Sequence, residues 1–238
     1  MITRLKLGEI TVEVVQKDIK NVHLSVYPPY GRVKIAAPSR MSEDTIRLFA
    51  ISKLGWIKQQ RLKLSHQDRE APRQYLDRES HDVWGNRYLL KVVEHDSPPV
   101  IVLKPRWMIM SVRPGTDNAK KRDILENWYR AQIRDAVTPL IAKWEPLLGV
   151  TVTRCFVQRM KTQWGSCSAE THGIRLNTEL ARKPRECLEY ILVHEMTHFL
   201  VRRHDERFVS ILDACLPNWK QLRKMLNDAP LSHANWTY

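Results

Sequence analysis

One helical segment constrains the fold of this chain more than any other feature of the sequence. Residues 194–198 are His-Glu-Met-Thr-His. At about 100° per residue, His194 and His198 differ by one turn plus about 40°, so both imidazoles project from one face of a helix. The preceding residues, Tyr190–Val193, are apolar on every side, as in a helix buried in a domain core. Polar side chains in such a helix need a compensating partner, and a metal ion supplies one.

The residue types in this segment suit zinc. Two neutral imidazole nitrogens one helical turn apart can bind one zinc ion at about 2.0–2.1 Å each. Glu195 projects from an adjacent face, where it can take a proton from a water molecule that the metal activates. The spacing therefore predicts a zinc centre with one ion per chain. The alternative to a metal site is a helix whose two histidines face solvent or form a hydrogen bond with each other.

A third metal ligand is predicted from the residues that follow this helix. His204 lies six residues after the second histidine, which is the spacing of zincins whose chain turns to bring in a third histidine. That turn usually contains a glycine where this chain has Val201, so we expect it to be built around residues 202–203. Glu206 is the weaker candidate, because no E-x-x-x-D motif follows the helix. Asp205 is expected to cap the next helix, or else to orient a ligand imidazole.

Glycine content and net charge limit the other function classes. The 238 residues include 8 glycines, whose spacing fits no dinucleotide-binding, P-loop or nucleophile-elbow motif. The 39 Lys and Arg residues exceed the 26 Asp and Glu residues, which gives a net charge of +13. This charge favours polyanions such as nucleic acid or nucleotides, and it also fits a basic surface without a dedicated ligand. A candidate anion surface, or else a solvated helix face, is formed by Lys53, Lys58, Arg61 and Lys63.

Cysteine spacing and hydropathy predict the environment of the protein. Its four cysteines show no C-x-x-C spacing, which indicates free thiols. The first residues lack the apolar core of a signal peptide. The longest apolar runs, such as Val100–Leu103, are far shorter than the roughly 20 residues of a spanning helix. We expect a soluble, cytoplasmic protein without membrane contact.

The chain changes character near residue 115, which predicts an α+β protein with two regions. Region 1–115 is expected to be β-rich with one helix, and region 116–238 to be mainly helical. Turn-bounded, alternating segments predict strands within 2–37 and over 83–84, 87–93, 100–103 and 108–112, with the helix over 42–64. A further helix follows Asp117, and Pro139 should kink or divide it. Later strands are expected over 151–158 and 173–176, and later helices over 185–202, 206–216 and 219–227.

Several further motifs accompany the two histidines. They are Trp164-Gly165-Ser166-Cys167, Ile174-Arg175-Leu176-Asn177, the apolar run before the histidines, His204, Phe208, Lys53-x-x-Trp56-Ile57 and Trp128-Tyr129-Arg130. Together they resemble the YgjP-like metallopeptidase family, a branch near the SprT-like zincins, over nearly the whole chain. Arg203 and Asp205 stand where that family commonly has asparagine and serine. The resemblance implies a zincin-like metallohydrolase fold for the helical region.

The predicted function is a zinc-dependent metallohydrolase, foremost a metallopeptidase. The expected metal ligands are His194, His198 and His204. Glu195 is the expected catalytic base, which takes a proton from water and delivers it to the leaving group.

Two alternatives stay open at this point. The resemblance also implies a nucleoside triphosphate (UTP-type) pyrophosphatase that uses the same zinc site, with Arg202, Arg203 and Arg207 as candidate phosphate ligands. The second alternative is a non-catalytic, zinc-containing module associated with nucleic acid.

The sequence leaves the details of substrate binding open. A peptide substrate is expected to pair with an edge strand, for which residues 173–176 are the candidate. The motif 164–167 fits either a role at the mouth of the site or simple packing, and a thiol nucleophile at Cys167 is disfavoured. The oligomeric state is unknown from sequence.

Overall fold

Two compact units make up the chain. The structure, a computed structural model, describes residues 2–27, 30–66, 73–160 and 163–228. Unit 1 contains the described residues up to 66, and unit 2 contains the described residues from 73 to 228. This division differs from the predicted change at residue 115. The strands between residues 80 and 112 share one hydrophobic core with the helices that follow residue 115, so the change in composition lies inside unit 2.

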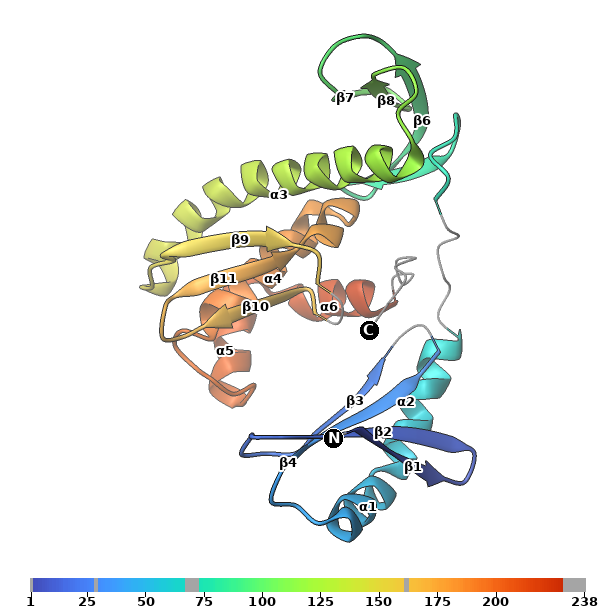
Figure 1. The fold of residues 1–238 in the computed structure, drawn as a ribbon. Helices are drawn as coiled ribbons and strands as arrows, with labels where there is room; N and C mark the ends of the chain where they lie inside the picture. The colour runs from blue at the N-terminus through green and yellow to red at the C-terminus, as the bar shows by residue number, and fades with distance from the viewer. Residues whose placement is uncertain (1, 28–29, 67–72, 161–162, 229–238) are drawn as a thin grey trace. The chain divides into compact units, whose positions relative to one another are not determined.

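Unit 1 consists of a four-stranded sheet and two helices (Figure 1). The strands are β1 (Ile2–Leu7), β2 (Ile10–Lys17), β3 (His23–Tyr27) and β4 (Arg32–Pro38), in the order β1-β2-β4-β3. β2 and β4 are parallel, and the two outer pairs are antiparallel. The helices are α1 (Glu43–Ser52) and α2 (Leu54–His66).

The helix expected over residues 42–64 is divided into α1 and α2. Ser42 caps α1 as predicted, because its side chain accepts a hydrogen bond from the backbone N–H of Thr45. Lys53 is the C-cap of α1, with the non-helical angles φ −100° and ψ 5°. Ile46 and Ile57 bury their side chains in the core of unit 1 together with the inward-facing strand residues. Both helices therefore pack on the sheet, and the break at Lys53 lies between them.

Unit 2 begins with a second four-stranded sheet. Its strands are β5 (Ser80–Val83), β6 (Asn86–Glu94), β7 (Val100–Lys104) and β8 (Trp107–Val112), in the order β5-β6-β8-β7. The long helix α3 (Asn118–Leu148) follows, capped by Asp117 and ended by Gly149 at φ 65°. Pro139 does not divide α3, which stays one helical element because a proline removes only one of its hydrogen bonds.

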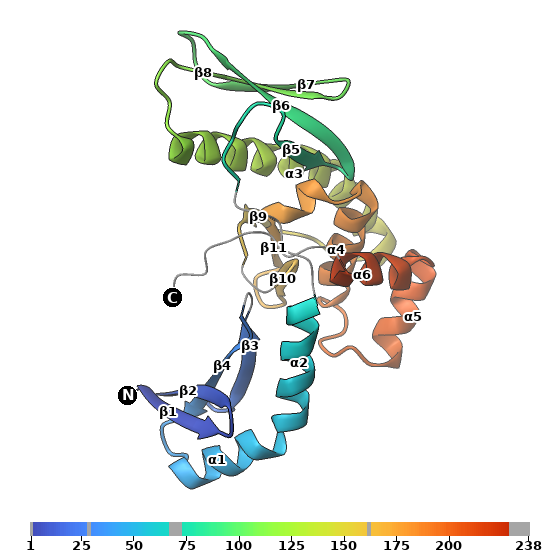
Figure 2. The same ribbon diagram turned by 90° about the vertical axis from the view of Figure 1, so that its right-hand side faces the viewer.

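A three-stranded sheet and four shorter helical elements complete unit 2. The sheet contains β9 (Arg154–Gln158), β10 (Gly165–Ser168) and β11 (Gly173–Asn177), in the order β10-β11-β9. The helical elements are η1 (Thr178–Arg182), α4 (Arg185–Thr197), α5 (Glu206–Cys215) and α6 (Trp219–Asp228). Both views of the ribbon place α3 between the two sheets of unit 2, and α3 contacts β7 and β9 (Figures 1 and 2). β10 and η1 were not predicted.

The element types agree with the predicted α+β class. Sheets and helices share the core of unit 2, in which α4 is the most completely buried α-helix. The four cysteines are unpaired, as predicted. Among the helices that the structure describes, none combines the length and the apolar character needed to cross a membrane.

Candidate metal centre

α4 carries the histidine motif through the core of unit 2. The helix starts after Pro184, and Glu186 lies in its first turn, where a carboxylate complements the positive helix end. α4 ends at Thr197, earlier than the predicted residue 202. His198 is its C-cap and keeps near-helical angles of φ −67° and ψ −14°, so the expected one-turn relationship to His194 is preserved.

The three predicted histidine ligands lie together. One ring nitrogen from each of His194, His198 and His204 can be chosen so that all three atoms lie within 4.8 Å of one another. The Nε2 atoms of His194 and His204 are 3.0 Å apart. Two nitrogens bound to one tetrahedral zinc ion are about 3.3 Å apart, given zinc–nitrogen distances near 2.0–2.1 Å. The donor set and its spacing therefore fit one metal ion of this kind.

The turn after α4 brings His204 to the other two histidines without a glycine. Val201 is buried, and its N–H donates to the carbonyl oxygen of Thr197 at 2.9 Å. The carbonyl of Val201 in turn lies 3.1 Å from Nδ1 of His198. Because a carbonyl only accepts, Nδ1 carries the proton and Nε2 is left as a metal-binding lone pair. Val201 thus orients one imidazole, which is a role that sequence spacing did not indicate.

Asp205 and Glu206 lie at the start of α5. Asp205 is the N-cap of α5, and its carboxylate accepts a hydrogen bond from the backbone N–H of Phe208 at 3.1 Å. Glu206 is the first residue of α5, and it does not belong to the cluster of possible ligand atoms found in the described chain. Of the two predicted candidates for the third position, the fold brings His204 to the histidine pair.

Phe208 packs against all three imidazoles. Its ring centroid lies 4.9 Å from that of His194 and 4.7 Å from those of His198 and His204. Phe208 is 2% exposed, so it forms an apolar support that restricts the rotation of the three rings. Capping by Asp205 sets the start of α5 and thereby the position of this ring.

Burial keeps the imidazole of His194 neutral near pH 7. Burial lowers the pKa of His194 to about 3, with smaller contributions from the other two histidines and from Arg223. Burial also lowers the pKa of His204, with smaller contributions from His198 and Arg223. A neutral imidazole has a free lone pair, so these side chains can bind a metal near pH 7 without first losing a proton.

Glu195 points into the same pocket and is almost completely buried. It is 6% exposed, and burial raises the pKa of its carboxyl group to about 7, against a smaller opposing effect of a hydrogen bond from Cys167. A carboxyl group with a pKa near 7 can both accept and return a proton at neutral pH.

The motif 164–167 forms the start of β10 and the wall of this site. A Cβ atom placed on Gly165 would lie 2.9 Å from Oε1 and 3.0 Å from Cγ of Glu195, and 2.8 Å from Cγ2 of Ile191. Only glycine leaves room for the glutamate there. Burial and the Glu195 carboxylate raise the pKa of the Cys167 thiol to about 12. The thiol therefore stays protonated, which agrees with the prediction that it is not a nucleophile.

These side chains line a pocket of about 540 Å³. β10 forms one wall and the histidines form another, with Arg202 also in the lining. Arg203 and Arg207 are not among the lining residues described for this pocket. β11, the predicted edge strand at 173–176, is instead the central strand, paired with β10 on one side and β9 on the other. The edge next to the histidines belongs to β10.

The comparisons with known proteins address the identity of this site. The family profile described as YgjP-like, metallopeptidase domain, matches residues 20–229. The chain belongs to the YgjP-like metallopeptidase family. The match includes the whole of α4, β10 and the three histidines, and it confirms the resemblance seen in the sequence and the prediction of a metallopeptidase.

Two solved structures are similar to part of this YgjP-like chain. The metallopeptidase zymogen abylysin of Pyrococcus abyssi is 20% identical, with a TM-score of 0.35, over 42% of this chain and 99% of that protein. The metallopeptidase zymogen jannalysin of Methanocaldococcus jannaschii is 23% identical, with a TM-score of 0.33, over 40% and 92% of the two chains. The comparison with curated proteins gave no match.

Proposed function

We propose that this YgjP-like metallopeptidase uses zinc, held by His194, His198 and His204, and that Glu195 moves the proton during peptide hydrolysis. The observation that carries the proposal is the convergence of three imidazoles and one buried carboxyl group on a single pocket. Three nitrogen ligands are typical of catalytic zinc sites, which keep a fourth position for water or substrate. Family membership supports a metal-dependent peptidase, and the donor set favours zinc among metals.

Each residue of the site has a separate task. The three imidazoles hold the metal, and the ring of Phe208, which packs against all three, restricts their rotation. When bound, zinc would lower the pKa of a water molecule and polarise the carbonyl group of the substrate. A carboxylate oxygen of Glu195 accepts the proton from the attacking water and returns it to the amine nitrogen of the leaving peptide. Gly165 and Cys167 keep that carboxyl group in the pocket wall.

A peptide substrate is supported by the edge strand of the small sheet. β10 pairs with β11 on one side and is the outer strand of its sheet on the other. An extended peptide can add to such an edge through main-chain hydrogen bonds. Since β10 lines the same pocket as the histidines, a peptide held on it has its backbone next to the metal position.

The variant Glu195→Gln tests this proposal. Glutamine keeps the shape of the side chain but cannot accept the proton. We expect metal content and thermal unfolding to match the wild type, while cleavage of a pool of unstructured peptides, followed by mass spectrometry, falls at least about 100-fold. Glu186→Gln is the matched control, because this exposed residue lies in the first turn of the same helix.

Two results would contradict the proposal. Peptide cleavage by Glu195→Gln at close to the wild-type rate would assign the base to another group. Release of pyrophosphate from a nucleoside triphosphate, lost in the same variant and accompanied by no peptide cleavage, would favour the pyrophosphatase alternative.

A further inference from the structure

A stripe of cationic and aliphatic side chains runs along the two helices of unit 1. Its members are Arg47, Ile51, Leu54, Lys58 and Arg61. Within each helix, their spacing of three or four residues places them on one side, and the two sides line one pocket. The stripe contains Lys58 and Arg61 from the candidate anion surface of the sequence. Lys53 is not in the lining, and the side chain of Lys63 lies outside the described part of the chain.

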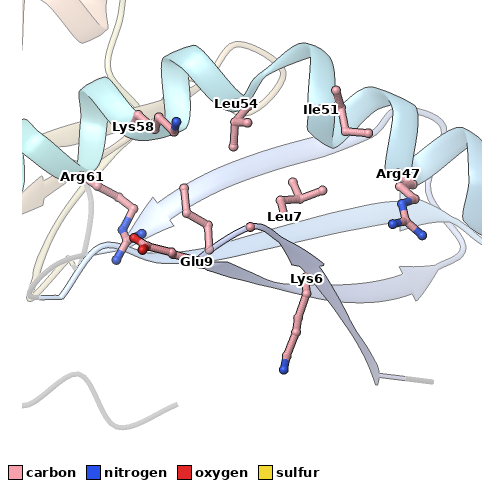
Figure 3. Close-up of a pocket in the computed structure, with 10 residues that line it drawn as sticks. Lys6, Leu7, Glu9, Arg47, Ile51, Leu54, Lys58 and Arg61 are labelled. Atoms are coloured by element: carbon pink, nitrogen blue, oxygen red, sulfur yellow. The ribbon is translucent and has the colours of Figure 1, made fainter.

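The stripe faces the turn between β1 and β2, and together they line a pocket of about 630 Å³ (Figure 3). The hairpin of β1 and β2 contributes residues 6–10, and we call this cavity the unit 1 pocket. Figure 3 shows Leu54 pointing from the helix toward the hairpin and Leu7 pointing toward the helix. The pocket thus has an aliphatic middle.

The aliphatic middle of the unit 1 pocket is incompletely covered. Ile51 is 48% exposed, and Leu54 is half-buried. Removing apolar surface of this kind from water makes the binding of a ligand more favourable. The pocket therefore suits a ligand with an aliphatic group.

Cations flank this middle from both ends. Figure 3 shows Arg47 toward one end of the stripe, and Lys58 and Arg61 toward the other. Within the described residues, none of these three side chains forms an ion pair, and Glu9 is the one acidic residue of the lining. The stem of Arg61 passes close to Gly31, where an added Cβ atom would lie 2.8 Å from Cγ of Arg61. A ligand with anionic groups at both ends matches this charge distribution.

We propose that the unit 1 pocket binds an acidic peptide segment in which carboxylates flank an aliphatic side chain. The aliphatic side chain covers Ile51 and Leu54, and the carboxylates pair with Arg47 at one end and with Lys58 and Arg61 at the other. Single-stranded nucleic acid fits less well, because the described lining contains no aromatic ring on which a base could stack. The unit 1 pocket shares no described lining residue with the pocket of the metal centre, and ligand binding there would add a function to hydrolysis.

Fluorescence anisotropy on the full-length protein tests the proposal. The probe is a labelled seven-residue peptide with leucine at its centre and aspartates on both sides, measured at about 150 mM salt so that long-range attraction is screened. Mass spectrometry checks that the peptide stays intact during the measurement. The variant Arg47→Glu/Lys58→Glu reverses two charges in the pocket. Lys17→Glu/Lys20→Glu makes the same change in net charge at exposed positions of unit 1 outside the lining.

We expect saturable binding that weakens at least tenfold in Arg47→Glu/Lys58→Glu and less than twofold in the control pair. Replacing the central leucine of the peptide by serine should also weaken binding at least threefold. Equal losses in both variant pairs, or equal binding of the serine peptide, would overturn the proposal. A single-stranded oligonucleotide of equal charge that displaces the peptide more tightly than unlabelled peptide does would assign the pocket to nucleic acid instead.

Discussion

Gly165 and Glu195 are in contact across the interface between β10 and α4. A Cβ atom on Gly165 would lie 2.9 Å from Oε1 of Glu195, which is closer than ordinary packing of a carbon atom allows. The two residues are 30 positions apart in the sequence. Their contact explains why a glycine stands in the motif 164–167 and connects this motif to the proposed chemistry.

Gly165→Ala is expected to impair catalysis more than metal binding. The added methyl group pushes the Glu195 carboxyl group from its position, and a displacement of about 1 Å can lower kcat about 100-fold. Overpacking should also cost about 1–3 kcal/mol of unfolding free energy. Steady-state kinetics, elemental analysis and thermal unfolding measure the three effects. Gly55→Ala is the control, because no atom lies within 4 Å of a Cβ placed there. An unchanged kcat in Gly165→Ala would show that Glu195 tolerates the methyl group.

Cys167 is expected to resist alkylation in metal-free protein. Its pKa of about 12 lies well above the ordinary 9.0, so at pH 8 the reactive thiolate fraction falls by about 1,000-fold. Glu195→Gln removes the negative charge that contributes to this shift, and should therefore speed alkylation of Cys167 by iodoacetamide. Cys155 is the internal control, because burial alone raises its pKa to about 11. Peptide mapping measures both rates, and a Cys167 rate that is the same in both proteins would contradict the contact with Glu195.

The purified protein is expected to contain about one zinc ion per chain. His194→Ala and His198→Ala each remove one of three ligands, and should lose the metal almost entirely. His95→Ala, an exposed histidine of unit 2 outside the cluster, should keep it. Elemental analysis of protein prepared without chelators gives the result. Full zinc content in either ligand variant would place the metal elsewhere.

Arg202 distinguishes a peptide substrate from a nucleotide. It is the arginine that lines the pocket among the three that the sequence put forward for phosphate binding. For peptides held by main-chain hydrogen bonds, Arg202→Ala should change KM less than about threefold. For a nucleoside triphosphate the same change would raise KM steeply and reduce its salt dependence, because charge attraction supplies the binding. Arg203→Ala, outside the described lining, is the matched control.

The sequence by itself determined the local features of the site and of the helix starts. The one-turn relationship of His194 and His198 follows from helix geometry alone, and the capping roles of Ser42 and Asp205 follow from side-chain chemistry next to a helix start. These features depend on residues within a few positions of one another. For that reason they could be predicted without knowledge of the fold, together with the α+β class and most strands and helices.

Only the tertiary structure decided the contacts between distant segments. Residues 173–176 were expected at a sheet edge, but pairing with β9 and β10 makes β11 central and puts β10 at the edge beside the metal centre. The packing of Gly165 against Glu195 and the support of three imidazoles by Phe208 arise in the same way. Strand order and helix packing depend on which apolar faces of distant segments bury each other. The spacing of residues within one segment does not determine this pairing.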